Sequence, residues 1–225
     1  MTRRPNGEFS MLSTTGADRR RLIGAAAALW APMAWAGAYD DFIRAVATDD
    51  VSAVQALLRR GVDVNLRDEK GQPALTVALR DGQLRVADAL LRAPGLEVDA
   101  PNADGETPLM MAALKGHLDA ARQLIERGAR LELEGWTPLH YAATGPSTAL
   151  VQLLLDRGAR VDVRSPNGST PLMMAARYGQ ESSVDALLSR GADPALRNER
   201  DMNASDFARS VQREALADRL ARPGR

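Results

Sequence analysis

The 225-residue sequence contains no cysteine, so it has no disulfide framework, no thiol nucleophile and no cysteine-based metal site. Only two histidines are present, and the 29 basic side chains are matched by 29 acidic ones. This balance leaves no excess positive charge for binding nucleic acid. The composition therefore argues against metalloproteins built on cysteine and against nucleic-acid-binding proteins.

Motifs for catalysis are missing as well. There is no Gly-x-Ser-x-Gly elbow and no glycine-rich phosphate loop. Neither His117 nor His140 has a third ligand at helical spacing in a recognisable metal motif. We predict no catalytic residue, no cofactor and no bound metal, and hence a protein that is not an enzyme.

What the sequence does contain is a repeated segment. Residues 105–113, 135–143 and 168–176 each run from a glycine through one variable residue and Thr-Pro-Leu to Ala-Ala. Recurrence at a fixed period is typical of chains in which short units stack on their neighbours. Because such a stack offers a long continuous surface and no enclosed pocket, the repeat favours a binding function.

Each unit predicts two helices. The threonine of Thr-Pro can accept an unpaired backbone N–H, and proline suits the first helical position because it lacks one. Gly82, Gly116 and Gly179 follow about nine residues later in the unit and predict the turn that ends the first helix. A second helix with apolar residues at i, i+3 and i+4 comes next, as in Val151, Leu154 and Leu155. Its left-handed end is predicted at Gly61, Gly128, Gly158 and Gly191.

This pattern resembles the ankyrin repeat, whose Thr-Pro-Leu-His-x-Ala signature stands at 137–142. The resemblance implies an all-α solenoid of antiparallel helix pairs with β-hairpin or loop fingers, in which His140 ties neighbouring repeats together. Successive repeat starts are 33, 34, 30, 33 and 33 residues apart. These starts are Ala38, Gly71, Gly105, Gly135, Gly168 and Asp201.

The predicted organisation is a segment 1–36 followed by one repeat domain, 37–225. Within the domain we place repeats at about 38–67, 68–101, 102–131, 132–164 and 165–197, with a C-terminal cap at 198–222. Two departures stand out. Pro73-Ala74-Leu75 lacks the threonine cap, and the connection from Gly128 to Gly135 is three residues shorter than that from Gly158 to Gly168, which predicts a notch in the row of fingers.

The segment 1–36 has the features of a secretory signal peptide. Three arginines, 19–21, precede an apolar run from 22 to 35, which ends in an Ala-x-Ala site at 34–36. The run is too short for a membrane span. We predict cleavage between Ala36 and Gly37 and a periplasmic protein of 24 basic and 27 acidic side chains. Sec or twin-arginine export, and a start at Met1 or Met11, both stay open.

By the same resemblance, finger tips and the exposed side of the first helices contact the partner. Trp136 and Tyr178 are the leading candidates because aromatic and arginine side chains carry most interface energy. The alternative for Trp136 is local packing over the shortened loop. The predicted contact residues are Trp136, Tyr178, Arg177, Lys115, Leu114, Arg80, Asp81, Glu106 and Asp104.

These observations predict an exported, monomeric module that holds or stabilises a periplasmic protein partner. Two alternatives stay open. One is an immunity protein that occludes the active site of a toxin. The other is a metal-binding or hydrolytic enzyme built on a repeat scaffold.

Overall fold

A computed structural model describes residues 31–222, and Ala38–Arg225 forms one compact unit of the chain. Most of the predicted signal peptide lies outside the described residues, so its role stays a prediction. The first helices of the repeats are α1 (Ala31–Ala47), α3 (Ala74–Asp81), α5 (Pro108–Lys115), α7 (Pro138–Thr144), α9 (Pro171–Tyr178) and α11 (Ala204–Arg209). The second helices are α2 (Val51–Arg59), α4 (Leu84–Arg92), α6 (Leu118–Glu126), α8 (Thr148–Asp156), α10 (Glu181–Ser189) and α12 (Glu214–Ala221).

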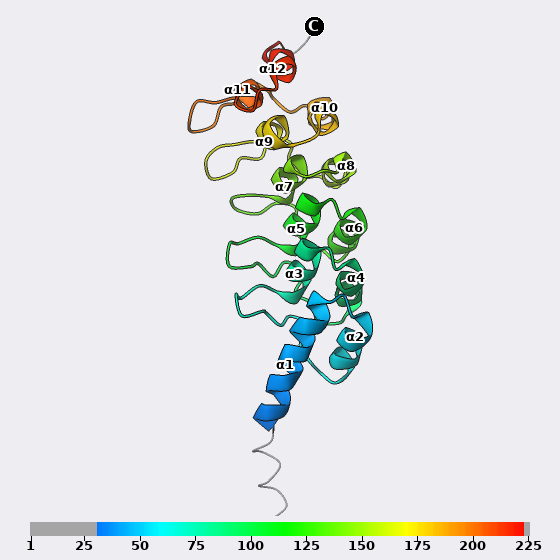
Figure 1. The fold of residues 1–225 in the computed structure, drawn as a ribbon. Helices are drawn as coiled ribbons and strands as arrows, with labels where there is room; N and C mark the ends of the chain where they lie inside the picture. Colours follow the sequence, from blue (N-terminus) through cyan, green and yellow to red (C-terminus); the bar gives the residue numbers. More distant parts are fainter. Residues whose placement is uncertain (1–30, 223–225) are drawn as a thin grey trace, which may run out of the picture. The chain divides into compact units, whose positions relative to one another are not determined.

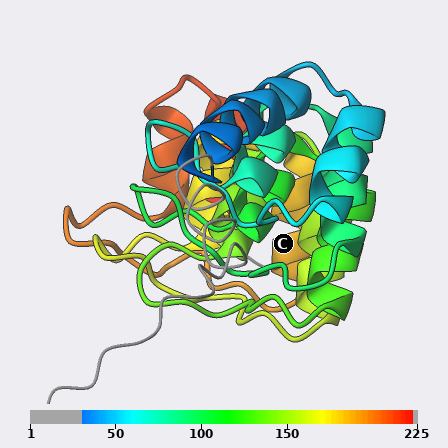
Figure 2. The same cartoon turned by 90° about the horizontal axis from the view of Figure 1, so that it is seen from below.

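From α3 onward the helix pairs stack in two columns (Figure 1). Loops project from the column of first helices, on the side away from the second helices (Figure 2). The fold class expected from the sequence, an all-α solenoid, is confirmed. The loops are fingers closed by backbone hydrogen bonds, such as Asp68 N to Gln72 O at 2.9 Å and Ser165 N to Ser169 O at 3.0 Å.

The apolar stripe of the second helices forms much of the core. Val151 and Leu154 of α8 are fully buried, and α8 packs between α6 and α10. The stripe is less complete at its edge, where Leu58 and Leu188 are only half-buried. One continuous core therefore runs through the repeats, as nearest-neighbour stacking requires.

The threonine caps form as predicted in the third and fifth repeats. Met110 N donates to Thr107 Oγ1 and Met173 N donates to Thr170 Oγ1, each at 3.4 Å. In return, the thioether sulfur of Met110 accepts from Thr107 N at 3.4 Å. The methionine thus satisfies a second unpaired N–H at the start of the helix.

The second repeat lacks this arrangement. Pro73 occupies the cap position of α3 without a side-chain hydrogen bond, and Thr76 stands where the other repeats have methionine or histidine. Its hydroxyl is buried and has no partner among the described residues.

Thr76→Val should therefore stabilise the protein by about 1 kcal/mol, because it removes an unsatisfied buried hydroxyl at nearly constant volume. Urea denaturation measures the change. Thr107→Val is the matched control and should destabilise by about 1 kcal/mol, because its hydroxyl caps α5. A loss of stability in Thr76→Val would show that the hydroxyl has a favourable partner.

Gly179 ends its helix in a different conformation from Gly82 and Gly116. Gly82 and Gly116 end their helices in the left-handed region, at φ 78° and 83°. Gly179 does not, because its φ is −87°. An added Cβ at Gly179 would overlap the carbonyl oxygen of Ala143, and one at Gly145 would lie 2.7 Å from Ala113 O. Close packing of neighbouring repeats, and not backbone freedom, therefore requires glycine at these two positions.

The end repeats replace turn glycines by polar residues. Asp201 occupies the repeat-start position with φ 56°, close to the 75° of Gly168. Asp49 and Gln212 adopt φ 54° and 61° between the two helices of the first repeat and of the cap. Ala38 does not begin a finger, because it lies within α1.

Side chains at the base of the fingers link each repeat to the next. A glycine follows the second helix of each repeat. The side chain four residues after this glycine accepts a hydrogen bond from a backbone N–H of the next repeat, two residues after the corresponding glycine there. In two links the donor is arginine, whose Nε also donates to the carboxylate at 3.0 Å. The links are Asn65 to Glu97 N at 2.8 Å, Asp99 to Arg130 N at 3.1 Å, Glu132 to Arg160 N at 2.8 Å and Asp162 to Asp193 N at 3.2 Å.

No helix within residues 31–222 is long and apolar enough to cross a membrane.

Candidate functional site

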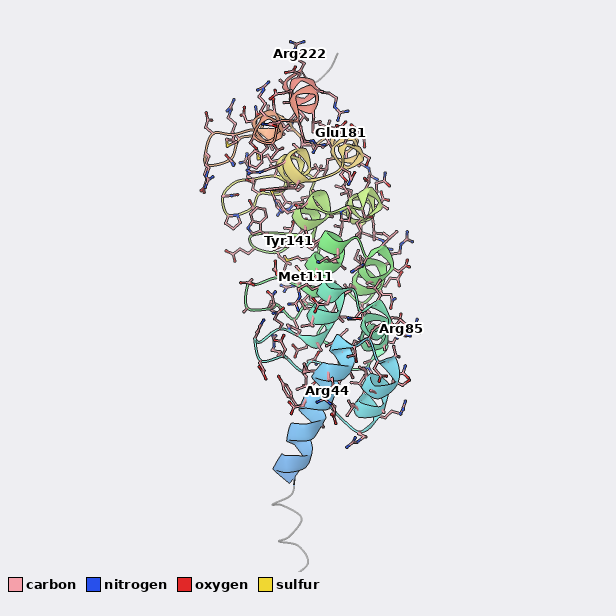
Figure 3. The ribbon with its side chains drawn as sticks, viewed as in Figure 1. Arg44, Arg85, Met111, Tyr141, Glu181 and Arg222 are labelled. Atoms are coloured by element: carbon pink, nitrogen blue, oxygen red, sulfur yellow. The ribbon has the colours of Figure 1, made fainter. Side chains whose placement is uncertain are left out.

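The first helices leave one surface uncovered by the second helices. We call it the first-helix face, and it consists of the side chains at the fourth, seventh and eighth positions of these helices, beside the fingers. Figure 3 shows Tyr141 on the side of the fingers and Arg85 on the side of the second helices. The first-helix face in four repeats consists of Val77, Arg80 and Asp81; Leu114 and Lys115, beside Met111, which is buried; Tyr141 and Thr144; and Met174, Arg177 and Tyr178.

A socket of about 230 Å³ opens on this face where the third, fourth and fifth repeats meet. It lies beside the finger shortened by three residues. Trp136 comes from the base of that finger, and its indole meets the imidazole of His140 edge to face, with ring centroids 5.2 Å apart. The lining residues are Leu114, Trp136, His140, Tyr141, Thr144 and Met174.

The two hydroxyl groups in the socket wall donate to acceptors inside the protein. Tyr141 donates its hydroxyl to Glu106 at 2.9 Å, and Thr144 donates to the carbonyl of His140 at 2.9 Å. Burial and the neighbouring carboxylate of Glu106 raise the pKa of Tyr141 far above its ordinary value. The phenol therefore remains a proton donor to Glu106, and the socket presents apolar surface.

His140 holds two repeats together. Its Nδ1 accepts from Thr137 N at 3.2 Å, so Nε2 carries the proton and donates to Ser169 O, in the next repeat, at 3.0 Å. Burial lowers the pKa of His140 to about 4 despite the bond to Ser169. His117 similarly links its repeat to the preceding one, with Nε2 3.0 Å from Leu79 O. His140 thus ties neighbouring repeats together, as the resemblance implied, and His117 does the same one repeat earlier.

Trp136 is half-buried, whereas the sequence suggested an exposed loop residue. The short finger brings its ring onto His140, so local packing accounts for part of its position. The rest of the ring still lines the socket with Leu114, a second predicted contact residue. Packing and binding are therefore compatible at this residue.

Tyr178 lies outside the socket and is 54% exposed. The guanidinium of Arg177 stands 5.1 Å from the centroid of its ring. In the following repeat, Val211 occupies the position equivalent to Tyr178 and is also exposed, at 36%. Sequence reasoning missed Val211, although alignment of Tyr178 with it by repeat register could have found it.

The remaining predicted residues are spread along the face. Arg80 is half-buried and pairs with Asp81 at 2.8 Å, which lowers the pKa of that carboxyl group. Glu106 is half-buried beside Tyr141, while Asp104 and Lys115 are exposed. Tyr141 and Met174, at the fourth helical position, were not predicted to line a site. Thr144 occupies the same helical position as the predicted residues Leu114 and Arg177.

Within residues 31–222, no group of three or more histidine, aspartate or glutamate side chains gathers as a metal ion would need.

This chain is similar to a chain in a solved complex and to segments of several larger proteins. A solved complex of a predatory endopeptidase from Bdellovibrio bacteriovorus with an immunity protein contains a chain that matches with a TM-score of 0.70 and 27% identity. The match covers 82% of this chain and 98% of that one. Sequence relatives include a Caenorhabditis elegans poly [ADP-ribose] polymerase tankyrase, 44% identical over 72 residues, and human ankyrin repeat domain-containing protein 63, 38% identical over 80.

The matched segments are 31% and 36% of this chain, but only 3% and 21% of the two relatives. They share the repeats with this protein, and the activities of the whole relatives do not transfer with them. The family model for ankyrin repeats matches residues 42–134 and 129–198, which is more than half of the sequence. Ankyrin repeats imply protein binding, and this chain belongs to the ankyrin-repeat family.

Proposed function

We propose that this protein is an exported, non-catalytic module that holds a protein partner in the periplasm. The observation that carries the proposal is the first-helix face, which combines an apolar socket with an exposed aromatic side chain. Contiguous apolar surface of this kind marks interaction sites when a polar rim surrounds it. Arg80, Asp81, Lys115 and Arg177 supply such a rim.

The test is capture of the mature protein with its partner from periplasmic extract, followed by identification of what co-purifies. The partner should bind through the first-helix face. Arg122→Glu on the opposite side, in α6, should leave capture unchanged, while Tyr178→Ala should weaken it. If nothing co-purifies, or if only the α6 variant loses the partner, the proposal is wrong.

Export rests on the arginines at 19–21, the short apolar run and the Ala-x-Ala sequence. We expect the mature chain to start at Gly37, which N-terminal sequencing of periplasmic material would establish. Replacing Arg19 and Arg20 by lysine should block export only if the twin-arginine route is used. Uncleaved protein found solely in the cytoplasm would contradict this part of the proposal.

An immunity role is the second candidate. It is favoured by the likeness to a chain from a complex between an endopeptidase and an immunity protein. The two roles differ in what happens to the partner. An immunity protein should abolish the activity of a captured hydrolase in a stoichiometric mixture, whereas a stabilising subunit should leave that activity intact and prolong its half-life.

A further inference from the structure

The first-helix face carries a cation next to the socket. Arg177 lies three residues after Met174 in α9, so the two side chains are neighbours on one face of the helix. Met174 lines the socket. An apolar surface and a guanidinium group are thus presented side by side.

Arg177 differs from Arg80, the other arginine of the first-helix face, in its hydrogen-bond and ion-pair partners. Arg80, at the same helical position in the second repeat, pairs with Asp81 and donates to Gln72. Arg177 has no hydrogen bond or ion pair with any residue in the range 31–222, and its Nε is buried without an acceptor. Because Arg177 is only half-buried and its guanidinium has no carboxylate partner within this range, its charge can pair with a carboxylate from outside the chain.

The socket favours an apolar group. Side chains of Leu114, Met174 and the ring of Trp136 form much of its wall, and the hydroxyls of Tyr141 and Thr144 already donate to acceptors inside the protein. A carboxylate, by contrast, matches the fork of an arginine side chain. The occupant that fits both features is an apolar side chain adjacent to a carboxylate.

We propose that the socket and Arg177 together recognise a partner segment in which an apolar side chain stands beside an aspartate or glutamate. The apolar side chain enters between Trp136, Leu114 and Met174, and the carboxylate pairs with Arg177. Tyr178, which already stacks with the guanidinium, keeps it oriented. This inference rests on the proposed function and names the chemistry of the partner.

The test is selection of short peptides from a displayed random library on the purified mature protein. Wild type should enrich peptides with an acidic residue next to a large apolar one. Arg177→Glu should reverse the charge preference toward lysine or arginine, and the affinity for a peptide selected on wild type should fall about tenfold or more. A purely structural role of Arg177 would not reverse the preference.

Leu114→Arg tests the socket separately. Arginine is tolerated at this helical position, as Arg80 and Arg177 show, so the variant should fold while its side chain blocks the socket. It should lose the requirement for an apolar residue. Arg122→Glu, on exposed α6, changes the charge by the same amount as Arg177→Glu; it is the control and should select the same peptides as wild type.

Three results would overturn the inference: no peptide enriched on wild type, enrichment without acidic residues, or equal binding of the selected peptides to Arg177→Glu. The proposed function is judged independently by capture of the natural partner. A partner that binds wild type, Arg177→Glu and Leu114→Arg equally well would preserve protein binding while rejecting this site.

Discussion

Replacing Leu154 by alanine is expected to lower the free energy of unfolding by about 2–5 kcal/mol. Leu154 is fully buried in α8, between α6 and α10, so truncation leaves a cavity that the neighbouring repeats can fill only in part. Because each repeat contacts only its neighbours, the loss weakens the helix pair itself and its interfaces on both sides.

Urea denaturation of the protein measures this change. Gln152→Ala is the control, since Gln152 is exposed on the same helix and alanine is a good helix former. Its effect should stay within about 0.5 kcal/mol. An equally small effect of Leu154→Ala would mean that the apolar stripe of α8 does not face the core.

The features that sequence reasoning predicted correctly depend on local chemistry. Thr107 caps α5 and Gly116 ends it because both roles need only residues within one turn of the helix. The buried stripe of α8 follows from spacing along a single helix. Asp201 was found by repeat register, although no glycine marks the position.

The features that were wrong or missed depend on contacts between repeats. Gly179 is required because Ala143 of the preceding repeat lies against it, and no pattern within one repeat reveals that contact. The packing of Trp136 on His140, by contrast, lies within one repeat and is the alternative that the sequence analysis offered. The Nε of Arg177 is buried and has no hydrogen-bond acceptor within residues 31–222, which the sequence alone could not show.

The socket likewise combines residues that could be predicted from the sequence with an arrangement that could not. Leu114 could be singled out from its helical position, and Trp136 from its residue type and its place at the base of a finger. The sequence could not show that both residues line one socket with Met174. That arrangement depends on the packing of three successive repeats and on the shortened finger beside them.

Acidification is expected to destabilise the protein through His140. Burial holds the pKa of this imidazole at about 4 in the folded protein, against 6.5 for an unperturbed histidine. The unfolded chain therefore binds a proton at a higher pH than the folded one. The stability that the neutral ring contributes is fully present above pH 6.5 and is lost as the pH falls toward 4.

Between pH 7 and pH 4.5 this loss should amount to about 2–3 kcal/mol. His140→Met isolates it, because Met110 and Met173 occupy the same position in the neighbouring repeats and their sulfur atoms accept the same backbone hydrogen bond. Ser169 O would not be left unpaired in this variant, since Ser165 N also donates to it at 3.0 Å.

Urea denaturation of both proteins at pH 7 and pH 4.5 provides the measurement. At pH 7 the variant should be slightly less stable than wild type, by about 1 kcal/mol, because one hydrogen bond between repeats is lost. At pH 4.5 the order should reverse, since wild type must either protonate a buried imidazole or unfold while the methionine variant has no such group. Parallel losses of stability in the two proteins would show that His140 does not titrate in this range, and that carboxyl groups elsewhere account for the acid sensitivity.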